Sequence, residues 1–160
     1  MKVLKFIDEQ LEKWFLIVSL IVMVLVTFMQ IVLRWFNAAT VWAEEFSRYV
    51  MLYQVWVGAS YAVHEDAHIR ITALIGKLSG GRRRGMDMVV LTLWLLFALW
   101  LTVEGCVLVG KIAAMGQVSS AMRIPMTIPY ASVPIGGALM TIRLVQKIVE
   151  RLRNTQEEEA

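Results

Sequence analysis

The sequence has few charged residues, a single cysteine and only two histidines. Charged side chains make up 18% of the 160 residues, whereas hydrophobic residues make up 58%. A soluble domain of this size needs more charge on its surface, so this composition predicts an integral membrane protein. The one cysteine, Cys106, lies within an apolar run. It excludes an internal disulfide and leaves the redox compartment undetermined.

Long runs of one charge sign are also missing from most of the chain. The net charge of +3 arises from short basic clusters that separate apolar runs. Such clusters are typical of membrane topology signals and not of a continuous surface that binds nucleic acid. We therefore expect membrane lipids and protein partners, and no nucleic acid.

Apolar runs long enough to cross a bilayer dominate the remaining sequence. A transmembrane helix needs about 20 mostly apolar residues, and backbone groups in lipid must be hydrogen-bonded internally. The sequence therefore predicts an all-α integral membrane protein with a four-span membrane domain over residues 14–153. The expected spans cover residues 15–34, 42–63, 87–110 and 126–148.

The segments outside these spans are amphipathic or acidic. Residues 1–13 place apolar side chains at helical spacing, which predicts a helix lying on the membrane surface. Residues 71–78 repeat the pattern between spans two and three, and residues 154–160 form an acidic tail. The first apolar run is too long for a signal peptide, so we expect it to be retained as a helix.

Basic residues are distributed unevenly between the two sides of the predicted membrane domain. Both terminal segments and the middle loop are basic, and these three segments fall on one side. By the positive-inside rule, both termini are expected in the cytoplasm. Of the 16 lysines and arginines, those expected on the opposite side are Arg34, Arg48, Lys111 and Arg123.

The stretch HEDAH at residues 64–68 fits the H-E-x-x-H pattern of zinc peptidases. His64 and His68 would share one helix face, with Glu65 as a base. A catalytic zinc needs a third protein ligand, and the chain has no third histidine. The pattern therefore favours a polar helix end near the headgroups, with His68 in a structural role. We expect no enzyme activity, catalytic residue, cofactor or metal, and a membrane zinc peptidase is the weaker alternative.

Three stretches together resemble a known transporter family. They are WAEEFSRY from residue 42, HIRI from residue 68 and IPMTIPYASVPIGGALM from residue 124. In order and spacing the chain resembles the DctQ-like small permease of tripartite ATP-independent periplasmic (TRAP) transporters. His68 matches the usual histidine of that family, whereas His64 stands where members often carry a basic or small polar residue.

This resemblance implies a complex in the bacterial inner membrane. A periplasmic substrate-binding protein captures a small organic acid, and a large permease subunit imports it with sodium. The small subunit is then a non-catalytic scaffold that braces the large subunit and binds no substrate. A stand-alone small multidrug exporter is the alternative, but such proteins use a carboxylate in span one, and span one here has none.

Several residues are candidates for binding these partners or for holding the helices. Glu44, Glu45 and Arg48 lie at the start of span two, where they either cap and neutralise the helix or bind a partner. Glu104, inside span three, is expected to form a salt bridge within the subunit or across a subunit interface. The candidate partner-binding residues are Trp42, Glu44, Glu45, Arg48, Trp56, Gly58 and Tyr130, and the candidate structural residues are Glu104, His68, Pro134 and Gly136.

Overall fold

The chain is all-helical in the computed structural model, which describes residues 2–38, 40–64 and 80–159. Side chains are described for residues 10–38, 40–63 and 85–152. The helices are α1 (Lys2–Trp35), α2 (Val41–His64), α4 (Gly80–Met115), α5 (Thr127–Tyr130) and α6 (Ser132–Glu159).

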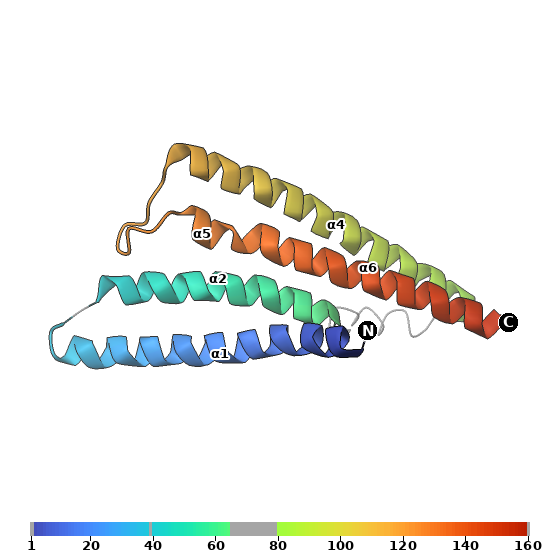
Figure 1. The fold of residues 1–160 in the computed structure, drawn as a ribbon, viewed down its shortest axis with the longest axis horizontal. Helices are drawn as coiled ribbons and strands as arrows, with labels where there is room; N and C mark the ends of the chain where they lie inside the picture. The colour runs from blue at the N-terminus through green and yellow to red at the C-terminus, as the bar shows by residue number, and fades with distance from the viewer. Residues whose placement is uncertain (1, 39, 65–79, 160) are drawn as a thin grey trace.

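The four long helices lie side by side in the order α1, α2, α6, α4 (Figure 1). α2 packs between α1 and α6, and α6 packs between α2 and α4. Residues 36–38 and 116–126 connect helices at one end, here called the loop end. α1 begins and α6 ends toward the opposite end, here called the termini end (Figure 1). α1 and α4 are therefore the two edges of the layer.

Three helices are long and apolar enough to cross a membrane: Gln10–Trp35, Gly85–Met115 and Thr127–Leu152. None of the apolar window of α1 and only 11% of that of α4 is buried, as is typical of helices that face lipid. The protein is thus a multi-pass membrane protein. α2 is not among the three helices. It carries Glu44, Glu45 and Arg48 in its first two turns, and Gln54 and several tyrosines further along. Its crossing of the membrane stays a prediction.

α1 is one continuous helix, where the sequence predicted a surface helix over 1–13 followed by a span over 15–34. No glycine or proline interrupts Lys2–Trp35, so nothing in the sequence forces a break. The helix ends at Trp35, and Asn37, two residues later, has a φ of 57°. The Asn37 and Ala38 N–H groups donate to the carbonyls of Arg34 and Leu33. This pairing closes the helix end as a Schellman motif.

The prolines divide the predicted fourth span. α5 and α6 stand where a single span over 126–148 was expected, and Ala131 separates them. Pro134 is the third residue of α6, where a missing N–H costs no intrahelical hydrogen bond. α6 also continues through Glu159, so the predicted tail over 154–160 is helical up to that residue. The surface helix predicted over 71–78 lies outside the described residues.

The buried core lies where α2, α4 and α6 meet. Its members are apolar side chains at helical spacing, and small residues allow the helices to approach. The core cluster consists of Val63, Leu91, Ala98, Met140 and Leu144.

Candidate functional site

At the loop end, Glu45 holds the segment between α4 and α5. Its Oε2 accepts hydrogen bonds from the backbone N–H groups of Ala121 at 2.9 Å and Met122 at 2.8 Å. Its Oε1 accepts one from the Tyr49 hydroxyl at 2.5 Å. A carboxylate that accepts three donors fixes all of them in position. Glu45 therefore joins α2 to a segment more than 70 residues later in the chain.

Two tyrosines extend this tie along the same face of α2. Glu45, Tyr49 and Tyr53 are spaced four residues apart, so their side chains lie one above another. The Tyr53 hydroxyl donates to the Ile128 carbonyl at 2.6 Å, and the Tyr49 hydroxyl lies 3.4 Å from the Met126 sulfur. This column fixes the approach to α6 at the loop end.

The held segment is a tight hairpin. Ser119 N–H donates to the Ile124 carbonyl at 2.8 Å, and Met126 N–H donates to the Gln117 carbonyl at 2.9 Å. Arg123, at the turn, has a φ of 53°, a conformation that costs energy for a residue with a side chain. The hydrogen bonds to Glu45 lie directly beside this turn and offset that cost.

Glu44 points away from this cluster. It pairs with Arg48 at 3.3 Å, and about two thirds of each side chain is exposed. An exposed pair at this helical spacing contributes well under about 1 kcal/mol. The two neighbouring acids therefore differ: Glu45 is bound within the chain, whereas Glu44 remains on the surface.

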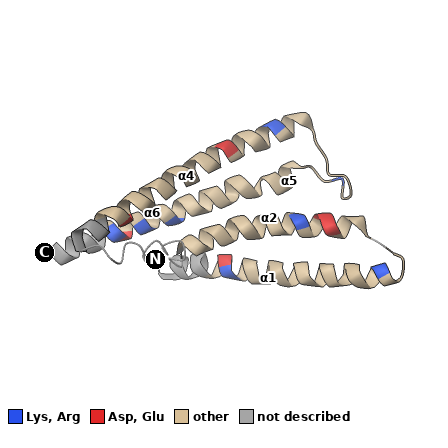
Figure 2. Ribbon diagram, turned by 180° about the vertical axis from the view of Figure 1, so that it is seen from behind, with Lys and Arg blue, Asp and Glu red and all other residues tan. Residues whose placement is uncertain are grey.

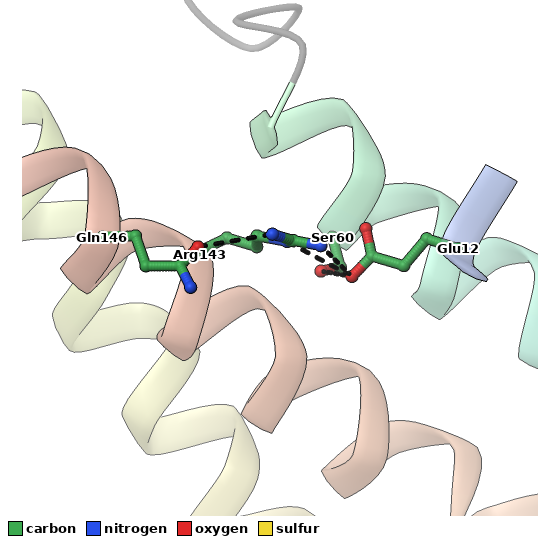
Figure 3. A network of polar contacts seen from close by, with 4 residues as sticks. All are labelled: Glu12, Ser60, Arg143 and Gln146. Atoms are coloured by element: carbon green, nitrogen blue, oxygen red, sulfur yellow. Dashed lines mark hydrogen bonds and ion pairs between the residues drawn. The ribbon is translucent and has the colours of Figure 1, made fainter. Parts of the chain in front are cut away.

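At the termini end, a buried ion pair joins α1 to α6 (Figure 3). Arg143 Nη2 lies 3.3 Å from Glu12 Oε1, and both side chains are more than 90% buried. The same oxygen accepts from the Ser60 hydroxyl of α2 at 3.2 Å. Arg143 Nη1 also donates to Gln146 at 3.3 Å. The network thus links three helices around one carboxylate.

Two further basic residues of α6 extend the network. The Lys147 ammonium donates to the Val63 carbonyl, near the end of α2, at 2.6 Å. Arg151 pairs with Asp87 of α4 at 3.3 Å. Arg143, Lys147 and Arg151 are spaced four residues apart, and they bind α1, α2 and α4 respectively. Figure 2 shows charged residues gathered toward the two ends of the layer.

Between these two ends, two adjacent glycines of α6 face its two neighbours. A Cβ added to Gly136 would overlap the Trp56 side chain of α2. A Cβ added to Gly137 would lie 2.6 Å from the Thr102 hydroxyl of α4. On α4, a Cβ at Gly105 would lie 3.0 Å from Pro134. Small residues therefore allow close contact on both sides of α6.

The candidate partner-binding residues fall into two groups. Trp56 and Glu45 contact other parts of this chain, and a Cβ added to Gly58 would lie 3.8 Å from the Leu16 side chain of α1. Trp42 and Tyr130 are exposed at the loop end, as are Glu44 and Arg48. Partner binding by any of them stays a prediction.

The candidate structural residues are placed as follows. Pro134 and Gly136 lie in contacts of α6 with α4 and α2. Glu104 is exposed on α4, and no ion pair within the described residues involves it. His68 lies outside the described residues, and His64 is the last residue of α2.

The sequence reasoning missed Glu12, Tyr49, Tyr53 and Lys147. Glu12 lies within residues 1–13, which the sequence predicts as an amphipathic helix on the membrane surface. The available signal was the spacing of four in two columns, one on α2 and one on α6. Such columns mark one face of a helix but do not identify what that face contacts.

Together, the fold and these clusters define a helical membrane protein whose buried polar groups tie its own helices together. The described part of the chain contains no group of three His, Cys, Asp or Glu residues arranged to hold a metal. The family model for tripartite ATP-independent periplasmic transporters, DctQ component, matches residues 23–154. The chain belongs to this family, and the predicted resemblance is confirmed.

Named relatives are similar over most of the chain. The isethionate TRAP transporter permease protein DctMQ of Oleidesulfovibrio alaskensis is 23% identical over 94% of this chain and 25% of its own length. The C4-dicarboxylate small permease DctQ of Rhodobacter capsulatus is 28% identical over 66% of this chain and 47% of itself. The sialic acid small permease SiaQ of Vibrio cholerae is 25% identical over 96% of this chain and 88% of itself.

These relatives give the chain a coarse role. Their names describe transporter subunits and not enzymes. The chain spans a quarter of the first relative and less than half of the second. It is a small permease subunit of a TRAP transporter.

Proposed function

We propose that this chain is the non-catalytic scaffold subunit of a sodium-coupled importer of small organic acids that depends on a periplasmic binding protein. In this role it braces the large permease subunit in the bacterial inner membrane. The substrates in the relatives' names, isethionate, C4-dicarboxylates and sialic acid, are all organic acids. That shared chemistry supports the substrate class.

The observation that best supports this proposal is that polar side chains of this chain are bound to other groups of the same chain. Glu12, Arg143 and Ser60 are buried and bound to one another, and Glu45 is bound to the hairpin. A transport site needs polar groups free to bind and release a solute. These groups instead hold helices in fixed positions, which suits a stationary support.

The proposal includes four spans, with both termini in the cytoplasm. α2 lies between α1 and α6, and both of these are apolar enough to cross the membrane. A helix packed between two crossing helices crosses with them. The basic residues Arg143, Lys147 and Arg151 stand at the termini end, which fits a cytoplasmic position.

Cysteine labelling tests this orientation. In a Cys106→Ser background, Asn37→Cys should react with a membrane-impermeant maleimide added to intact spheroplasts. Asn154→Cys should react only after the membrane is permeabilised. The reverse pattern would contradict the orientation, and labelling of both positions from outside would contradict an even number of spans.

Exposed residues at the loop end are the proposed contacts with the periplasmic binding protein or with the large subunit. They comprise Trp42, Glu44, Arg48 and Tyr130. Glu45 is bound internally and acts on such a surface only by fixing the adjacent hairpin. Trp56 and Gly58 act by positioning α2.

Co-purification tests the assembly. A tagged form of this chain, expressed with the large permease, should purify with it in a fixed ratio, and uptake in cells should require both chains. A large permease that purifies alone and transports at the full rate would contradict a bracing role.

A further inference from the structure

The outer face of α4 differs from the outer face of α1, although both helices form edges of the layer. The buried residues of α4 include Leu91, Ala98, Gly105 and Ile112, and these face α6. Exposed residues run along the opposite side at spacings of three and four. We call them the Glu104 stripe: Leu93, Phe97, Trp100, Glu104, Val107 and Lys111.

The stripe contains a carboxylate at membrane depth. Glu104 lies eleven residues before the end of α4, which corresponds to about 16 Å along the helix. Its side chain is exposed, and among the described residues it has neither an ion pair nor a hydrogen bond. Lys111, two turns away, lies about 10 Å along the axis, too far for a direct pair. An ionisable group at this depth is costly in lipid and normally faces protein or water.

Aromatic side chains stand next to this carboxylate. Trp94 meets Phe97 edge to face with ring centroids 6.0 Å apart, and Phe97 lies 6.1 Å from Trp100. Leu93, Trp94 and Phe97 line a shallow apolar hollow. Trp100 precedes Glu104 by one helical turn. The apolar hollow, the aromatic rings and the Glu104 carboxylate therefore form one continuous surface along α4. This surface offers an apolar recess for packing and an acceptor for a charged donor.

The outer side of α1 differs from the Glu104 stripe, and this difference indicates what binds the stripe. From Phe15 to Leu33 its exposed side is uncharged, and it is apolar except for Thr27, whose hydroxyl donates to the Met23 carbonyl. Acyl chains can therefore cover this side. Acyl chains carry no charged group that could pair with the Glu104 carboxylate. The complement of a carboxylate at this depth is a Lys or Arg carried by another transmembrane helix. The relative DctMQ is a permease protein of which this chain matches only 25%, so a much larger permease moiety accompanies the similar segment there.

We propose that the Glu104 stripe is the docking surface for a transmembrane helix of the large permease, whose Lys or Arg side chain pairs with Glu104. This inference rests on the proposed scaffold function and specifies where the large subunit binds. It also separates the edges of the layer: α4 faces protein and α1 faces lipid.

Charge variants in the complete complex test the pairing. Glu104→Gln and Glu104→Lys should reduce the large permease recovered with the tagged chain, the reversal by at least about tenfold. The matched control is Glu150→Lys, which reverses an exposed acid of α6 outside the stripe and should leave recovery unchanged. Phe97→Ala should also reduce recovery, whereas Phe28→Ala on the exposed side of α1 should not. Equal amounts of monodisperse chain are compared, so that a folding defect is not counted.

Cross-linking tests the same docking surface without changing Glu104. With Glu104 intact and Cys106→Ser as background, Trp100→Cys should cross-link to the large permease, and Leu25→Cys on α1 should not. Recovery of the large permease by the Glu104 variants at the wild-type level would overturn the inference and leave the scaffold function standing. Cross-links from Trp100→Cys only to lipid, or only to a second copy of this chain, would overturn it likewise. Failure of the wild-type chain to bind the large permease would instead remove the proposed function.

Discussion

At the scale of single residues, adjacent acids have opposite roles. Glu45 accepts three hydrogen bonds that fix the hairpin, and Glu44 forms an exposed pair with Arg48. Their order in the sequence gives no reason for this difference. It arises because α2 turns Glu45 toward the segment that precedes α6, and that segment lies more than 70 residues away in the chain.

Glu45→Gln should lower the free energy of unfolding in detergent, because three hydrogen bonds converge on this carboxylate. The amide removes the negative charge, and its single oxygen cannot replace both carboxylate oxygens. Either the Tyr49 hydroxyl or the N–H groups of Ala121 and Met122 then face an NH2 group instead of an acceptor. Glu44→Gln is the control and should change stability by less than about 1 kcal/mol. Equal effects of the two substitutions in a denaturant titration would contradict the assigned roles.

The buried pair of Glu12 and Arg143 allows a sharper test. Arg143→Met should destabilise the chain by about 3–5 kcal/mol, because it leaves the Glu12 carboxylate buried without its counter-ion. The double variant Glu12→Leu with Arg143→Met should recover most of this loss, since neither charge then remains. Arg48→Met, at an exposed pair, should cost less than about 1 kcal/mol. A double variant no more stable than Arg143→Met would contradict the pairing.

At the scale of elements, α6 is the centre of the structure. It binds α1, α2 and α4 through basic residues at the termini end, and its glycines admit α2 and α4 between the two ends. The edge helices α1 and α4 bury little of their apolar surface within this chain. Defects in α6 should therefore affect the whole layer, whereas changes on the outer side of α1 should remain local.

Gly136→Ala should destabilise the layer by about 1–3 kcal/mol, because the new methyl group overlaps the Trp56 side chain. Gly110→Ala on α4 is the matched control, since nothing lies within 4 Å of a Cβ at that position. The control should be neutral or slightly stabilising, as alanine favours a helix more than glycine does. Thermal unfolding of the two purified variants distinguishes these outcomes, and equal midpoints would contradict the close contact.

The sequence predicted the helical membrane class from its apolar runs, because hydrophobic length is a local property. It did not predict the continuity of α1 or the end of the C-terminal helix. Residues 1–13 look amphipathic whether or not the helix continues, and acidic residues at 157–159 do not break a helix. The sequence also did not predict the pair of Glu12 and Arg143, since the two residues are 131 positions apart. Local spacing identifies a face of a helix but not the helix that it contacts.

At the scale of the whole molecule, the helices form an open layer and not a closed bundle. Polar contacts at both ends and close packing between them hold α2, α4 and α6 together. An open layer leaves broad apolar surfaces for lipid and for a partner. We propose that this architecture serves a subunit that supports the large permease and does not itself move solute.

Transport by reconstituted vesicles tests this central claim most directly. Vesicles that contain only this chain, supplied with a sodium gradient, the binding protein and its organic acid, should accumulate no substrate. Vesicles that also contain the large permease should accumulate it. Uptake by vesicles that hold this chain without the large permease would contradict the account.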